Sequence, residues 1–360
     1  MRRAGALLLI LASGLALAAS PASAATRGAL PDLDPFTVPR PSIPFRDRVI
    51  ERPSVAAARE TASSTARRYP VHDGKGRTVT IGVSGPCSSV CTAADPQRIA
   101  DFLGGIAHGA EISLLRVQLV TNSEMAGICG SGALACYFPG QNQMFLSGND
   151  DVGADGATRE FVLTHEYGHH LADHRLNPPF SPTVDWGTKR WATYERVCQG
   201  ARAGALVPGD EGADYYRNPG EAFAEAFAFN RFRNLVGWQW TSLLRPNGGS
   251  FAAIRQDALH PWKHRVRSVV AGVLGAGGAQ RRVVRIPTSL DGVLSLGLSS
   301  SAGVDFDLVL RDNGGRVLRS SESPGPSEAI DYTICGQAKV KASVVRITGS
   351  GRFRLLIKRP

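Results

Sequence analysis

The stretch "FVLTHEYGHHLADH", Phe161 to His174, decides how the first half of the chain folds, because it reads as a buried helix carrying four of the chain's eight histidines. Residues four apart share one face of a helix, so His165 and His169 can each present a ring nitrogen to one ion. Glu166 lies one step round, where its carboxylate can reach a water molecule on that ion. The two remaining histidines fall on other faces, so only the first two are predicted ligands.

A second helix is expected to supply the third ligand. It begins at Asn218 in "NPGEAFAEAFAFNRF", where the Asn-Pro opening is typical of a helix start. Glu221 and Glu225 lie four apart on one face of this helix, among Ala and Phe residues. An unpaired carboxylate is costly in such an apolar setting, so a cation is expected beside it.

The surrounding pattern predicts an α+β domain over residues 71–270, a Gly- and Ala-rich linker over 271–280 and a small all-β sandwich over 281–360. Apolar residues alternate with others in the last segment, and "DNGG" marks a tight turn. Before the histidine helix, the expected elements are a strand over 77–84, a helix over 95–110 and strands over 111–120 and 142–148.

The first 24 residues are typical of a secretory signal peptide, with a basic start, an apolar run and small residues ending at Ala24. We therefore expect a secreted protein with no membrane span after signal removal, because no later segment is long and apolar enough. Residues 25–70 are rich in Pro, Arg, Ala and Ser, which predicts either a pro-segment or a linker.

Export makes disulfide bonds the favoured state of the six cysteines. Fifteen pairings are open to six cysteines. The short spacings favour two small loops and leave one long pair, namely Cys87 with Cys91, Cys129 with Cys136, and Cys198 with Cys335.

The formal net charge of +10 favours an anionic cell-surface polymer as a partner outside the cell. A nucleic-acid partner is not expected, because the arginines are spread along the chain rather than gathered with aromatic residues.

"HEYGHH", followed about fifty residues later by "NPGEAFAEAF", resembles the gluzincin metalloproteases, and the second motif is similar to a stretch of anthrax lethal factor. The resemblance implies a zincin-like domain in which Glu221 is the zinc ligand and Glu225 a supporting acid. Two other zincin patterns do not fit, because His174 is one residue early for a metzincin ligand and Arg190 stands where an aspzincin has its Asp. The C-terminal "DFDLVLRD" and "GSGRFRLLIKRP" resemble the bacterial pre-peptidase C-terminal domain, which is appended to secreted peptidases.

These features together predict a secreted zinc endopeptidase acting on protein or peptide substrates, with one Zn²⁺ and with Glu166 as general base. The resemblance implies that Tyr215 or Tyr216 stabilises the oxyanion. Asp173, four residues after His169, is the candidate partner of that ligand. Two other functions stay open: a non-enzymatic surface or cell-wall binding protein with a zincin-like fold, and a metal-dependent amidase acting on cell-wall cross-links.

Overall fold

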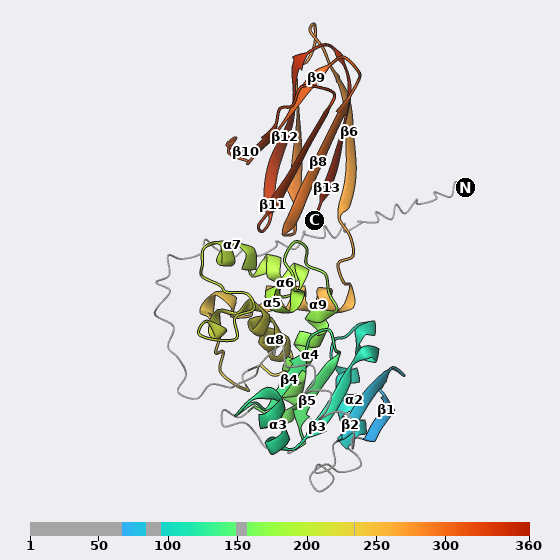
Figure 1. Ribbon diagram of the computed structural model, residues 1–360, viewed down its shortest axis with the longest axis vertical. Helices are drawn as coiled ribbons and strands as arrows, with labels where there is room; N and C mark the ends of the chain where they lie inside the picture. Colours follow the sequence, from blue (N-terminus) through green and yellow to red (C-terminus); the bar gives the residue numbers. More distant parts are fainter. Residues whose placement is uncertain (1–66, 84–94, 149–156, 234) are drawn as a thin grey trace, which may run out of the picture. The chain divides into compact units, whose positions relative to one another are not determined.

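The computed structural model describes residues 67–83, 95–148, 157–233 and 235–360 (Figure 1). The predicted signal peptide, nearly all of the 25–70 segment and the Cys87 and Cys91 pair lie outside these residues. Within the described ranges, no helix is both long and apolar enough to cross a membrane. An α+β region is followed by a β-sandwich, so the predicted fold class is confirmed.

The α+β region is built on a five-stranded mixed sheet in the order β1-β2-β3-β5-β4. The three inner strands run parallel, and the two edge strands run antiparallel to their neighbours. The predicted strands correspond to β2, β3 and β5, but the one expected over 111–120 begins only at Arg116, because residues 110–114 form a 3-10 helix, and the helix expected over 95–110 ends at Gly105. β4 escaped prediction because its four residues are all buried and therefore show no alternation. The strands are β1 (Arg67–His72), β2 (Thr78–Val83), β3 (Arg116–Val120), β4 (Ala135–Phe138) and β5 (Gln143–Ser147).

Helix α4 (Arg159–Asp173) packs against both the sheet and helix α8 (Pro219–Phe229) (Figure 1). Each helix begins at a side-chain cap, because Thr158 accepts a hydrogen bond from the Phe161 N–H and Asn218 accepts one from the Gly220 N–H. The other helices of the region are α2 (Asp95–Gly105), α3 (Asn122–Cys129), α5 (Thr183–Trp186), α6 (Lys189–Tyr194), α7 (Val197–Arg202), α9 (Gly248–Leu259) and the short 3-10 helices η2 (Ala110–Leu114), η3 (Tyr215–Arg217) and η4 (Ser242–Leu244).

The sandwich consists of two four-stranded antiparallel sheets, β10-β9-β12-β7 and β11-β8-β13-β6. Alternate residues of both sheets form one apolar core, to which β9 contributes Phe306, Leu308 and Leu310. The strands are β6 (Val266–Leu274), β7 (Arg281–Thr288), β8 (Gly292–Ser300), β9 (Asp305–Arg311), β10 (Val317–Ser321), β11 (Ser327–Ile334), β12 (Ala338–Thr348) and β13 (Gly351–Arg359).

Two expected domain boundaries were wrong. The sandwich begins at Val266 rather than 281, because β6 pairs with β13 along its whole length, and only residues 275–280 of the expected 271–280 linker form a turn. Gly272 sits within β6 because the Phe353 ring lies against it: a Cβ there would be 2.7 Å from the Phe353 Cε1 atom. The first region also begins earlier than expected, since Arg67 opens β1 within the segment read as pro-segment or linker.

Two predicted disulfides are present in the described residues. Cys129 joins Cys136 between α3 and β4. Cys198 of α7 joins Cys335, which follows β11, across 137 positions of sequence. Beside the second bond, the Gln199 Nε2 donates to the Cys335 carbonyl at 3.0 Å. The long pair thus links the α+β region covalently to the sandwich.

Candidate metal centre

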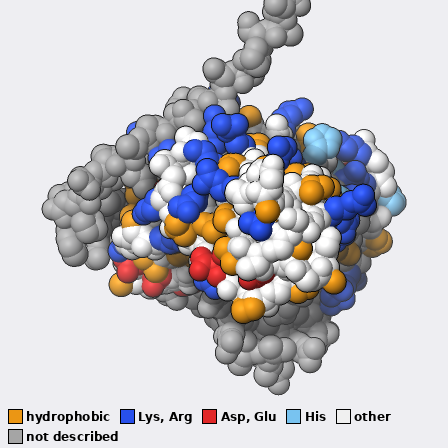
Figure 2. Space-filling view, turned by 90° about the horizontal axis from the view of Figure 1, so that it is seen from above, with side chains coloured by type: hydrophobic (Ala, Val, Ile, Leu, Met, Phe, Trp, Pro, Cys, Tyr) orange, Lys and Arg blue, Asp and Glu red, His pale blue; other side chains and the backbone are white. Residues whose placement is uncertain are grey.

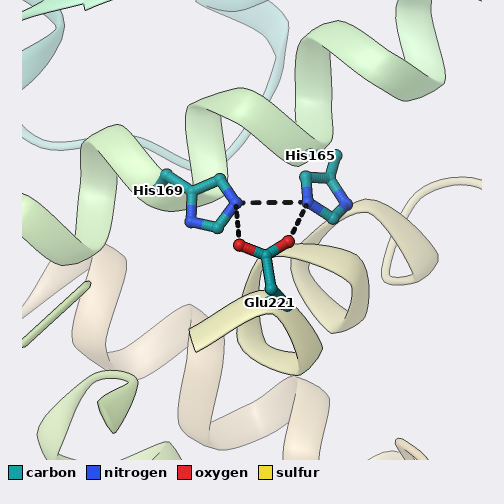
Figure 3. Close-up of side chains that lie close together, drawn as sticks. All are labelled: His165, His169 and Glu221. Carbon is teal, nitrogen blue, oxygen red and sulfur yellow. Dashed lines mark hydrogen bonds and ion pairs between the residues drawn. The ribbon is translucent and has the colours of Figure 1, made fainter. Parts of the chain in front are cut away.

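Three side chains from α4 and α8 converge on one point (Figure 3). The His165 and His169 Nε2 atoms lie 3.2 Å apart. The Glu221 carboxylate reaches both rings, with Oε2 3.6 Å from the His165 Nε2 and Oε1 3.4 Å from the His169 Nε2. All three side chains are fully buried. The structure therefore brings together the two histidines and the glutamate predicted as ligands.

The spacing of these donor atoms fits a tetrahedral zinc ion. Zinc lies about 2.0–2.2 Å from nitrogen and oxygen ligands, so two ligands of a tetrahedron stand about 3.4 Å apart. The two histidine Nε2 atoms stand 3.2 Å apart, close to that value, and each of them has one of the two Glu221 oxygens 3.4 or 3.6 Å away. Two neutral imidazoles and one carboxylate also form a donor set that zinc uses in hydrolytic sites. The group can thus hold one metal ion.

Glu225 sets the tautomer of His165. Its Oε2 lies 2.9 Å from the His165 Nδ1, and both side chains are buried. A carboxylate there accepts a hydrogen bond from a protonated Nδ1. The Nε2 atom then has no proton, and its lone pair is directed into the space between His165, His169 and Glu221. Glu225 therefore occupies the position expected of the supporting acid, and Glu221 that of the ligand.

Gly168 determines how closely α4 approaches α8. A Cβ at this position would lie 2.7 Å from the Ala224 Cα and 3.2 Å from its Cβ. Because a backbone atom cannot move aside as a flexible side chain can, any larger residue must push the helices apart. The glycine inside "HEYGH" thus fixes the distance between the two histidines and Glu221.

Replacing Gly168 with Ala should lower the affinity for zinc about tenfold, because ligand geometry tolerates displacements of only about 0.5 Å. The measurement is a competitive zinc titration against a chromogenic chelator. Gly127→Ala is the matched control, since a Cβ at this exposed helical glycine of α3 meets nothing within 4 Å. Equal zinc affinity in the Gly168 variant and the parent would show that the close approach does not set the site.

Of the predicted general base and the two predicted tyrosines, Tyr215 directly contacts a member of the group. Glu166 is fully buried on α4, directly after His165. The Tyr215 hydroxyl donates to the Glu221 Oε2 at 2.9 Å. Tyr216 packs edge-on against the Tyr215 ring, and its carbonyl accepts the Thr241 N–H. The geometry therefore favours Tyr215 over Tyr216.

Asp173 does not have the contact expected of it. Instead of supporting His169, its Oδ2 accepts hydrogen bonds from the Tyr137 hydroxyl at 2.9 Å and from the Gly140 N–H at 2.7 Å. The sequence spacing was right for a shared face with His169, but the carboxylate turns towards the sheet. Asp173 thus anchors the end of α4 to β4 and the turn that follows.

The two other histidines of the motif have structural contacts. His170 lies between the Tyr137 hydroxyl at 3.1 Å from Nδ1 and the Glu111 carbonyl at 2.9 Å from Nε2. Burial lowers the pKa of His170 to about 4, so its ring is neutral near pH 7. His174 contacts the Asn142 side chain. Neither ring is part of the metal group.

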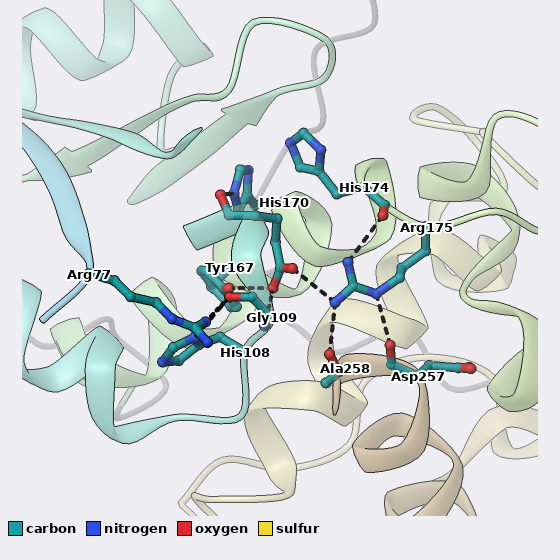
Figure 4. Close-up of polar contacts among 10 residues, drawn as sticks. Arg77, His108, Gly109, Tyr167, His170, His174, Arg175, Asp257 and Ala258 are labelled. Atoms are coloured by element: carbon teal, nitrogen blue, oxygen red, sulfur yellow. Dashed lines mark hydrogen bonds and ion pairs between the residues drawn. The ribbon is translucent and has the colours of Figure 1, made fainter. Parts of the chain in front are cut away.

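A buried polar network behind α4 was not predicted. Arg175 donates to the Glu111 carboxylate at 3.0 Å and to the carbonyls of Asp257 and Ala258 at the end of α9 (Figure 4). The Tyr167 hydroxyl donates to the same carboxylate at 2.8 Å. Glu111 therefore ties α4 to both η2 and α9, from the side of the helix opposite the ligands.

Trp240 also lies beside the site and was not predicted from the sequence. It is 3% exposed, and its ring centroid lies 5.9 Å from that of His165 and 6.1 Å from that of Tyr215. The tryptophan thus forms an apolar wall beside one ligand and the candidate oxyanion donor. The only signal in the sequence was the paired tryptophans of "GWQW".

Comparisons with known proteins do not assign this chain to a family. The chain matches no known family model, and no curated protein matches it significantly. Among solved structures, the C-terminal sandwich resembles the pre-peptidase C-terminal domain of a Bacillus anthracis collagenase, at 14% identity and a TM-score of 0.23, over 25% of this chain and 89% of that one.

Two other solved structures have similar scores. A Yersinia pseudotuberculosis mitogen is 15% identical with a TM-score of 0.22, over 27% of this chain and 87% of that one. Aeromonas hydrophila PliG, a periplasmic inhibitor of g-type lysozyme, is 6% identical with a TM-score of 0.19, over 26% and 85%. At these identities and TM-scores, the likenesses assign no activity.

Proposed function

We propose that the protein is a secreted zinc-dependent endopeptidase. The observation that carries this proposal is the buried group of His165, His169 and Glu221, whose ligand atoms lie within 4.8 Å of one another, with the His165 Nδ1 beside Glu225. When bound there, Zn²⁺ would polarise a substrate carbonyl and bring the pKa of a water molecule towards neutrality.

The chain's own groups supply the proton transfers. Glu166 directly follows His165 on the same buried helix, and in this proposal it takes a proton from the attacking water and returns it to the leaving amine. Tyr215 already donates a hydrogen bond at the Glu221 carboxylate. Its hydroxyl is therefore within reach of a carbonyl oxygen at the site, where it stabilises the developing negative charge.

Metal removal tests this function. Purified protein treated with a chelator should stop cleaving casein and a peptide library, and stoichiometric zinc should restore cleavage. Glu221→Ala should lose bound zinc, because it removes a ligand. Glu225→Ala should keep the ligands but bind zinc about 10- to 100-fold more weakly, because the tautomer of His165 is no longer held.

Zinc content measured by atomic spectroscopy separates these outcomes. Full zinc retention in Glu221→Ala would overturn the ligand assignment. Cleavage that persists unchanged after chelation would overturn the metal dependence itself.

A further inference from the structure

Three cations stand in one cross-strand row on the sandwich. Lys341 of β12 pairs directly with Arg285 of β7 on one side and Arg311 of β9 on the other. The neighbouring residue on each strand faces the apolar core, so alternation turns all three cations outward. Adjacent strands lie about 4.8 Å apart, which places three positive charges within about 10 Å.

This arrangement is unfavourable without a partner, because like charges directly opposite each other destabilise a sheet. The Lys341 Nζ donates to the Asn313 carbonyl at 2.8 Å, and the Arg311 Nη1 donates to the Gly315 carbonyl at 3.2 Å. Both acceptors are neutral groups of the β9–β10 turn, so they position the cations without cancelling the charge. Among the described residues, no carboxylate lies within ion-pair distance of the row.

The sandwich also carries most of the protein's net positive charge. Residues 266–360 contain fourteen Lys and Arg against seven Asp and Glu, a net +7 of the chain's +10. On the face shown in Figure 2, Lys and Arg side chains are widespread and Asp and Glu side chains are few. The row thus lies in a domain whose field attracts anions.

We propose that Arg285, Lys341 and Arg311, here called the cationic row, bind a linear phosphodiester polymer of the poly(glycerol phosphate) kind. The row lies on an exposed sheet surface, so it fits an extended chain crossing the strands. Phosphate oxygens accept hydrogen bonds from both guanidinium and ammonium groups.

The rest of this sheet face disfavours other polyanionic partners. The outward positions of β7, β9 and β12 include Val, Ser, Pro and Asp besides the cations, but no aromatic residue. Single-stranded nucleic acids bind through stacking on aromatic rings, which this face does not offer. Val283 of β7 and Ile347 at the end of β12 are exposed, so apolar side chains are few on this sheet but not absent, and an anionic vesicle is therefore one of the competitors in the test.

The test compares two triple variants of the full chain for binding to synthetic poly(glycerol phosphate). R285Q/K341Q/R311Q should lower affinity at least about tenfold at 0.15 M salt. It should also flatten the slope of log K against log salt by about 2, because three phosphate contacts are lost. R267Q/R352Q/R354Q is the matched control, with equal charge loss on the outer face of the other sheet, and should lower affinity less than about threefold.

Three results would overturn the proposal: equal loss in both variants, no binding by the parent, or equally tight binding of a single-stranded oligonucleotide or an anionic vesicle. Thermal unfolding monitors folding, and R285E alone should reproduce the loss if the triple variant is destabilised. Because binding is measured without turnover, the result is independent of the proposed peptidase activity.

Discussion

Replacing Glu166 with Gln should lower kcat for peptide cleavage about 10³-fold while zinc binding stays intact, because a general base contributes 10²- to 10⁴-fold. Glutamine keeps the shape of the buried side chain but cannot accept the proton of the attacking water. The measurement is kcat on a quenched fluorescent peptide, together with zinc content by atomic spectroscopy.

Glu160→Gln is the matched control, because it makes the same substitution on the same helix at a side chain that is 35% exposed. Its kcat should stay within about twofold of the parent, as is usual for surface substitutions. A Glu166 variant that binds zinc and still cleaves at the parental rate would rule out Glu166 as the base. In that case the rival functions, a binding protein above all, would gain support.

Replacing Glu111 with Gln should lower the free energy of unfolding by about 3 kcal/mol, because it leaves the buried Arg175 guanidinium without its counter-charge. Chemical denaturation at pH 7 measures the difference. Glu160→Gln serves again as control: its ion pair with Arg98 is 3.5 Å long and solvent-exposed, so its loss should cost less than about 1 kcal/mol.

The effect of the Glu111 variant should depend on pH. Burial alone would raise the pKa of Glu111, but the Arg175 guanidinium and the hydrogen bonds from the Gly109 N–H and the Tyr167 hydroxyl outweigh burial and lower it. Because the folded pKa is the lower one, the ionised carboxylate stabilises the fold above about pH 4.5 and this contribution is lost as pH falls through the folded value. The parent and the variant should therefore converge in stability in acid. A constant difference across this range would mean that charge pairing is not the cause.

The parts of the protein that could be predicted are those that depend on short-range pattern. The two ligand helices were found from apolar periodicity, a capping residue and the spacing of His165, His169 and Glu221. The sandwich was found from alternation along its strands. Within each helix or strand, the information lies within about fifteen residues, which is the range over which periodicity can be read, whereas pairing Glu221 with the histidines about fifty residues earlier rested on the cost of a buried carboxylate and on the resemblance.

The parts that escaped prediction depend on contacts between distant segments. Glu111 meets Arg175 across 64 positions, and nothing near either residue signals the other. Gly272 was predicted to lie in a linker. It is part of a strand in which the Phe353 ring, 81 positions later in the sequence, occupies the space of a side chain. Asp173 had suitable spacing, but the sheet residue Tyr137 provided a different donor.

The bond between Cys198 and Cys335 makes the intervening polypeptide a closed covalent ring. That ring contains α8, the connection after α9 and most of the sandwich. A single backbone cut within it leaves both new chain ends attached through the disulfide. The helices of the candidate metal centre and the cationic row would thus remain in one molecule after such a cut.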